Sequence, residues 1–273
     1  MNKLKLLFAL TVFSIITVSC EKNNGNDETN VRDKFLVDKI YDYDDNLLGE
    51  YFYDNNNRLI KAITTNLERD HSWKAEFEYE NGRVSKIIHD SWYESHFFYD
   101  SKKQLIRREL HASSMPMSED FLYENGHVVG IRFDDSLYDT YAYFYDNSMN
   151  VTKHIRTVSG LTFFPTEEDP VLQETDWEFT SYFEYDNRPK PNFGIDHLFT
   201  YDPLPVYGSW ERNLSKNNIT EITLEENGRY VEKSTWTYTY NENGLPSTIE
   251  IKHESSFETL KPVFLRITYK QIE

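Results

Sequence analysis

Residues 76–88 read EFEYENGRVSKII, and this stretch decides the fold. Its aromatic residues Phe77 and Tyr79 alternate with glutamates, which is the two-residue period of a strand with one buried face and one wet face. Asn81-Gly82 follows, and both residue types accept the positive φ angles that a tight hairpin turn requires. An aliphatic residue then opens a second extended segment. The stretch therefore predicts a β-hairpin whose inner face is aromatic and aliphatic.

The same unit recurs along the chain, as an alternating segment that ends in Tyr and an acidic or amide residue, a short turn, and an aliphatic return segment. The further copies are EYFYDNNNRLIKAI from Glu50, HFFYDSKKQLIRRE from His96, DFLYENGHVVGIRF from Asp120, AYFYDNSMNVTKHI from Ala142, YTYNENGLPSTIEI from Tyr238, and a degenerate ITLEENGRYVEKS from Ile222. Weaker strands are expected near 37–43, 177–185 and 263–269. More than a dozen strands follow from this count.

These hairpins predict an all-β fold, a long antiparallel meander in which sequence neighbours pair. Twist accumulates with strand number, so such a meander should curl, split into two packed sheets or close into a barrel. Few or no helices are expected beyond the N-terminal signal helix. A membrane-spanning barrel is disfavoured, because the apolar positions are rich in Tyr and the segments are broken by charges such as Arg107-Arg108.

The first twenty residues have the order of a secretory signal. Lys3 and Lys5 precede an apolar run over residues 6–18, and Thr17-Val18-Ser19-Cys20 then leads into a polar stretch. The run is too short to cross a bilayer, which takes about 20 apolar residues. The four residues resemble a lipobox, so we expect cleavage before Cys20 and lipidation of its thiol. The alternative is an ordinary cleavage site followed by an incidental cysteine.

The expected organisation is a signal peptide at 1–20, a flexible linker at 21–33 and one repetitive β domain at 34–273. Cys20 is the only cysteine, so the β domain has no disulfide, thiol nucleophile or cysteine zinc site. Twenty-nine basic and 46 acidic residues give a net charge of −17, which argues against nucleic acid as a partner. Attachment to a membrane is expected through the acyl chains of the anchor. We expect a monomer without a cofactor.

Between about 160 and 218 the repeat falters, and six of the nine prolines gather there. Because proline donates no hydrogen bond to a sheet, this stretch predicts long loops inserted among the hairpins. Its aromatic residues either cap the sheet as part of the core, or form a glycan- or peptide-binding surface in which Trp177, Tyr207 and Trp210 stack on the ligand. The sequence does not separate these two interpretations.

The Tyr-Asp units, together with LSKNNITEI from Leu214 and EYDNRPKPNFG from Glu184, resemble a family of Bacteroidota lipoproteins of unknown function with YD-like repeats. The resemblance covers most of the chain. It implies a porin-like β fold and carries over neither an activity nor a functional residue.

The chain carries no sequence motif of a catalytic site. Its eight histidines occur singly, and its ten glycines never form Gly-x-Gly. The acidic cluster around Asp42 lacks the glycine and glutamate of an EF-hand loop, so turn chemistry explains it better than calcium. The leading hypothesis is a non-catalytic, lipid-anchored outer-membrane protein, facing the cell surface or the periplasm, that binds a glycan or protein. The alternatives are a glycan hydrolase using paired carboxylates and a purely structural envelope protein.

Overall fold

Each quoted copy of the repeat forms an antiparallel hairpin in the computed structural model, which describes residues 31–66, 71–90, 93–112, 117–133, 139–164, 171–206, 210–255 and 261–272. The predicted hairpin at residues 76–88 joins β4 to β5, with Phe77 opposite Ile87. The signal segment and Cys20 lie outside the described residues, as does most of the expected linker.

The described chain contains sixteen strands and one short helix. They are β1 (Phe35–Tyr41), β2 (Leu47–Tyr53), β3 (Leu59–Asn66), β4 (His71–Glu80), β5 (Arg83–His89), β6 (Tyr93–Tyr99), β7 (Leu105–Ala112), β8 (Met117–Glu124), β9 (His127–Phe133), β10 (Asp139–Tyr145), β11 (Val151–Phe164), β12 (Val171–Pro189), α2 (Trp210–Leu214), β13 (Asn217–Glu226), β14 (Arg229–Tyr240), β15 (Pro246–Ser255) and β16 (Val263–Gln271).

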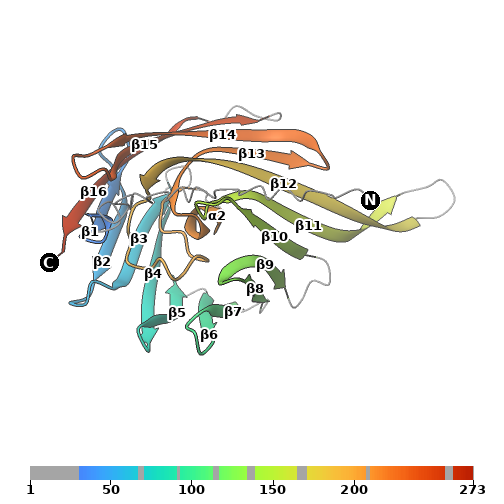
Figure 1. Cartoon of the computed structure of the whole chain (residues 1–273), viewed down its shortest axis with the longest axis horizontal. Helices are drawn as coiled ribbons and strands as arrows, with labels where there is room; N and C mark the ends of the chain where they lie inside the picture. Colours follow the sequence, from blue (N-terminus) through green and yellow to red (C-terminus); the bar gives the residue numbers. More distant parts are fainter. Residues whose placement is uncertain are drawn as a thin grey trace, which may run out of the picture.

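The meander closes into a barrel (Figure 1). Each strand pairs with its sequence neighbours, and β1 pairs with β16, where Val37 lies opposite Tyr269 and Ile40 opposite Ile267. The predicted all-β meander of hairpins is therefore confirmed, and of the three predicted arrangements the closed barrel is the one that forms. Closure pairs every strand of the described wall on both sides over part of its length, whereas β11 beyond Val158 and β12 before Phe179 pair only with each other.

Two kinds of turn join the strands. In the first, both residues of Asn81-Gly82, Asn125-Gly126 and Asn227-Gly228 have positive φ, as a two-residue hairpin turn requires. In the second, the carboxylate of Asp54 accepts hydrogen bonds from the backbone N–H groups two and four residues further on. Asp100, Asp146 and Asn241 do the same. The turn at 241–245, predicted from Asn243-Gly244, is of this second kind, with positive φ at Gly244.

A β-bulge recurs where an even-numbered strand meets the next odd-numbered one. The register shifts beside Tyr53, Tyr79, Tyr99, Tyr123, Tyr145, Tyr185 and Tyr240. A bulge leaves one residue without a ladder partner and makes two consecutive residues share a face. This explains why the sequence alternation breaks just after each of these turns. We call this end of the barrel the tight-turn end.

A ring of tyrosines links the hairpins at the tight-turn end. Each hydroxyl donates to the backbone carbonyl of a residue at or near the start of the preceding strand, at 2.7–2.9 Å. The donors are Tyr53, Tyr79, Tyr99, Tyr123, Tyr145, Tyr185, Tyr238 and Tyr269, and the acceptors are Val37, Leu59, Val84, Leu105, Val128, Val151, Ile219 and Pro246. One such bond therefore joins each pair of neighbouring hairpins. We call this set the tyrosine ring.

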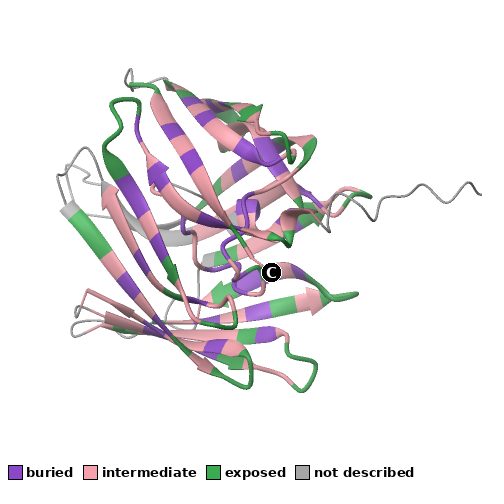
Figure 2. Cartoon of the chain, turned by 90° about the vertical axis from the view of Figure 1, so that its left-hand side faces the viewer, coloured by how far each residue is buried: buried purple, intermediate pink, exposed green. Residues whose placement is uncertain are grey.

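Residues 190–206 and 210–216 leave the wall between β12 and β13 and fill the barrel interior (Figure 2), so we call them the plug. Phe193 packs edge-on against Tyr51 and Phe199 against Phe121, with ring centroids 5.0 Å apart in each pair. Leu198 is 1% exposed. For these plug residues the core interpretation is confirmed. The plug matters because a sixteen-strand barrel is too wide for its wall side chains alone to fill.

The insertion is narrower than the sequence indicated. We predicted loops over about 160–218, but β11 and β12 continue through much of this range and pair from Lys153–Tyr182 to Phe164–Val171. Among the described residues of this range, 190–206 and 210–216 leave the sheet. Proline does mark the boundary, because Pro189 is the last residue of β12.

The outer face of the barrel carries cross-strand ion pairs. Lys86 bonds Glu78 at 3.0 Å, Arg107 bonds Asp120 at 2.9 Å, and further pairs include Lys39–Glu50 and Lys233–Glu221. Opposite charges across a strand pair stabilise a wet sheet surface. Among the described residues, no helix is long and apolar enough to span a membrane.

Candidate functional site

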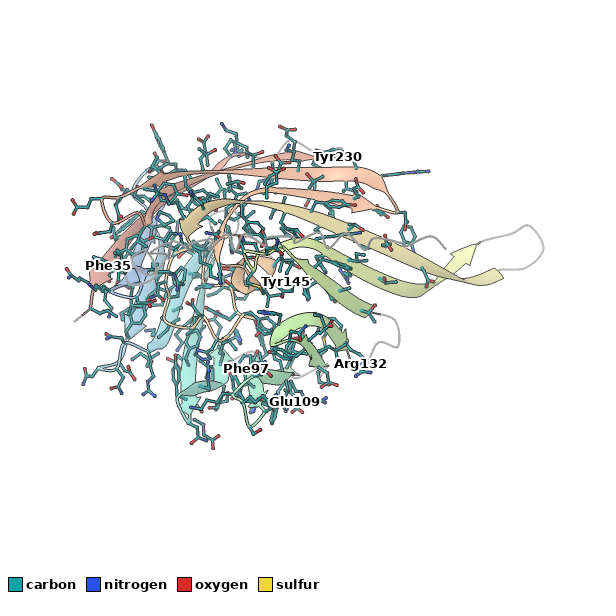
Figure 3. The ribbon with its side chains drawn as sticks, in the orientation of Figure 1. Phe35, Phe97, Glu109, Arg132, Tyr145 and Tyr230 are labelled. Carbon is teal, nitrogen blue, oxygen red and sulfur yellow. The ribbon has the colours of Figure 1, made fainter. Side chains whose placement is uncertain are left out.

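A hollow of about 450 Å³ lies beside Asn227-Gly228, a two-residue turn between β13 and β14 that stands at the end of the barrel opposite the tight-turn end. Its lining residues are Trp177, Glu226, Asn227, Arg229, Tyr230 and Val231. We call it the rim pocket. Its volume falls within the range of small-ligand sites. Figure 3 shows Tyr230 far along the molecule from Phe35, where β1 begins.

Hydrogen bonds between β12 and the turn hold the pocket in shape. The N–H of Asn227 donates to the carbonyl of Glu178 at 2.7 Å, and the N–H of Glu178 donates to Oδ1 of Asn227 at 3.0 Å. Asn227 and Gly228 adopt φ angles of 50° and 73°, which reverse the chain in two residues. Trp177 immediately precedes Glu178, so these two hydrogen bonds fix the backbone that carries the indole relative to the turn.

Two large aromatic side chains of the pocket are open to solvent. Trp177 is 39% exposed and Tyr230 is 49% exposed. The hydroxyl of Tyr230 donates to the carbonyl of Glu254 at 3.2 Å, which restricts the ring. Arg229, Glu226 and Asn227 add a cation, a carboxylate and an amide. Aromatic faces beside polar groups of both charges can stack on a ligand ring and hydrogen-bond its hydroxyls.

Of the three residues predicted to bind ligand, the structure describes the side chain of one. Trp177 lines the rim pocket. Trp210 is the first residue of α2, and Tyr207 lies outside the described residues. The sequence analysis missed Tyr230 and Arg229. The signal for Tyr230 was the degenerate copy itself, in which it stands two residues after Gly228, where the copies with Asn81-Gly82 and Asn125-Gly126 have a valine.

A second polar group lies buried where α2 meets the wall. Nδ1 of His154 lies 2.8 Å from Oε1 of Glu211. The imidazole stacks on Tyr141 and Tyr143, with ring centroids 4.9 and 5.1 Å away. Glu211 is 2% exposed. His154 therefore lies in the interior, between the wall and α2.

Neighbouring ion pairs fasten the rest of the plug. Arg108 of β7 bonds Glu119 of β8 at 2.5 Å and donates to the carbonyl of Thr200 at 3.3 Å. Burial raises the pKa of Glu119, and the Arg108 charge opposes that shift. Arg212 pairs with Asp202 and lies over the Trp236 ring, 5.1 Å from its centroid. These contacts explain the buried charges as links between plug and wall.

The acidic cluster near the N-terminus is a turn. Oδ1 of Asp42 accepts the backbone N–H groups of Asp44 and Asn46, at 2.9 and 2.8 Å. These bonds lower the pKa of Asp42, although desolvation by burial opposes them. Turn chemistry thus accounts for this cluster. Within the described residues no group of three or more His, Cys, Asp or Glu side chains could hold a metal ion.

The fold and the pocket define a class, a closed sixteen-strand antiparallel barrel with an internal plug and an aromatic pocket at one rim. Its chain is similar to a porin-like protein from Bacteroides uniformis, with 13% identity, a TM-score of 0.48, and coverage of 81% of this chain and 90% of that one. It also matches the Tc holotoxin pore of Photorhabdus luminescens at 13% identity and a TM-score of 0.33, covering 84% of this chain and 15% of the toxin chain. Neither a family model nor a curated protein matches the chain.

Proposed function

We propose that this protein is a lipid-anchored envelope protein that binds a carbohydrate in the rim pocket without chemically changing it. The observation that carries the proposal is the pairing of two solvent-open aromatic residues, Trp177 and Tyr230, in one hollow with Arg229 and Glu226. Sugars present apolar ring faces and many hydroxyls, which match aromatic faces flanked by polar side chains. The ordering of Tyr230 by its bond to Glu254 lowers the entropic cost of stacking.

The anchor is supported by the leader and lipobox-like residues that end at Cys20. Residues 31–34 lie at the tight-turn end, because the carbonyl of Lys34 accepts the N–H of Ile272 and Arg32 bonds Asp196 of the plug. The rim pocket is at the opposite end. An anchored barrel would therefore hold the pocket away from the membrane, where it meets ligands.

A glycan array probed with the purified protein, followed by calorimetric titration of the best ligand, tests the binding role. We expect Trp177→Ala and Tyr230→Ala each to weaken binding at least tenfold, a loss of about 1.4 kcal/mol. Trp73→Ala is the matched control, because Trp73 is 42% exposed on β4 and does not line the pocket. Equal losses in all three variants, or an array without a hit, would refute the site.

The hydrolase hypothesis stays a prediction. The two most buried glutamates among the described residues are Glu211 and Glu119, at 2% and 4% exposure, and each faces a basic side chain between wall and plug. Their placement supports a structural role. Incubating the protein with the glycans that it binds, and following product release by mass spectrometry, separates binding from cleavage.

A further inference from the structure

Six large apolar side chains form an exposed arc on the outside of the tight-turn end. Phe52, Ile60, Phe98, Ile106, Leu122 and Phe144 are 37%, 40%, 43%, 40%, 44% and 48% exposed. We call this set the apolar arc. Its members share a position in the repeat, since four immediately precede a tyrosine of the ring and the two isoleucines lie in the bulge opposite. Single exposed apolar residues are ordinary on a protein surface, whereas a row of them at the same height on several strands is not.

Each phenylalanine of the arc faces a cation across its hairpin. Phe52 pairs with Lys61, whose Nζ lies 5.0 Å from the ring centroid, and Phe144 pairs with Lys153 at 5.7 Å. Phe98 pairs with Arg107. Long basic side chains can lay their methylenes on apolar surface and extend their charge to a phosphate. This combination suits a lipid headgroup region better than open water.

The fold does not require apolar residues at this level. In β4 and β5 the same position holds Glu78 and Lys86, which form an ion pair. In β14 and β15 it holds Thr239 and Thr248, hydrogen-bonded at 2.6 Å. The arc thus occupies β2–β3 and β6–β10, on either side of the polar pair on β4–β5, and polar residues replace it on β14–β15. Its one-sidedness indicates a contact outside the protein.

We propose that the apolar arc docks on the bilayer to which the chain is anchored. Ten residues separate Cys20 from Val31, so an extended linker of eleven steps reaches about 40 Å at most and holds the tight-turn end near the membrane. The arc lies about two residues from the turns, roughly 7 Å along a strand. Interfacial segments bury their apolar face about 5–10 Å into the headgroup region. If the turns enter the headgroup region to this depth, the arc reaches the boundary with the acyl chains.

This inference rests on the proposed anchor, and one experiment tests both. The full chain carrying Phe98→Cys is labelled with a polarity-sensitive fluorophore and reconstituted through its lipid into vesicles of phosphatidylethanolamine and phosphatidylcholine. Labelling is specific, because the sole native cysteine, Cys20, carries the lipid thioether. The matched control is Thr239→Cys, an exposed residue at the same repeat position on the polar side.

We expect the emission of the position-98 label to shift to the blue on vesicles and to be quenched by spin-labelled lipid, with neither change at position 239. Flotation with the vesicles but equal behaviour of the two labels would refute the docking and leave the anchor intact. A wild-type chain that does not float refutes the anchor and the docking with it. A shift that disappears when the protein is diluted on the vesicles assigns the arc to a second copy of the chain and overturns the proposal.

Discussion

At the scale of single residues, the tyrosine ring predicts a cost for removing one oxygen atom. Tyr79→Phe keeps the ring of the side chain but leaves the carbonyl of Leu59 without its 2.8 Å partner. An unsatisfied buried acceptor costs about 1–2 kcal/mol, so the free energy of unfolding should fall by that amount. Chemical denaturation measures it. Tyr182→Phe is the control, since Tyr182 lies on the outer face at 41% exposure; equal losses would contradict the role assigned to the ring.

A second prediction at the scale of single residues is that buried histidines make the protein less stable at acidic pH. Nε2 of His197 accepts the N–H of Val84 at 3.3 Å, and burial, aided by Arg83, lowers the pKa of His197 to about 4. The unfolded chain, with a histidine pKa of about 6.5, binds the proton more readily, so stability is full above pH 6.5 and falls as the pH drops toward 4. Thermal melting across this window should show a shallower slope for His197→Gln than for wild type. The pKa of His89 is also lowered to about 4. In the His197→Gln variant, His89 should therefore maintain part of the fall in melting temperature with decreasing pH.

At the scale of elements, the plug should fold as part of the barrel. Leu198 is 1% exposed among wall and plug residues, so Leu198→Ala should cost about 2–5 kcal/mol and shift a single unfolding transition for the whole chain. Leu122→Ala, at a 44% exposed position on β8, should change stability by less than about 0.5 kcal/mol. Two separate transitions in the Leu198 variant would show that the plug is an independent loop.

The sequence predicted the hairpins well because their signals are local. Alternation over residues 75–80 and the positive-φ pair Asn81-Gly82 each act within one hairpin. The hydroxyl bond of Tyr79 to Leu59 depends on a neighbouring hairpin, and nothing local distinguishes it from packing. Of the residues that line the rim pocket, the sequence analysis named only Trp177. An aromatic residue such as Trp177 is visible in the sequence, whereas its approach to Tyr230 depends on how β12 and β13 align.

At the scale of the whole molecule, the outer face of the barrel bears on how the proposed anchor would attach the protein to a membrane. Membrane-spanning barrels present an apolar band about 25 Å tall on their outer face. Here the outer face carries ion pairs on many strands, such as Lys86–Glu78 and Arg107–Asp120, and its apolar arc is one level deep. The interior, filled by the plug, supplies the core instead. The proposed anchor then provides the attachment that the wall itself does not.

If the lipid anchor and not the polar outer face attaches the protein, Cys20→Ala should release it from the membrane. Without acyl chains the arc alone offers too little apolar surface for stable attachment, since firm anchoring takes two signals. The variant should therefore leave the membrane fraction and remain folded, monomeric and soluble without detergent, as fractionation, gel filtration and circular dichroism would report. Its melting temperature should match that of the wild-type protein, because residue 20 precedes the first strand, which begins at Phe35. A variant that stays in the membrane, or that needs detergent to keep its strands, would show that the barrel wall itself is embedded in lipid.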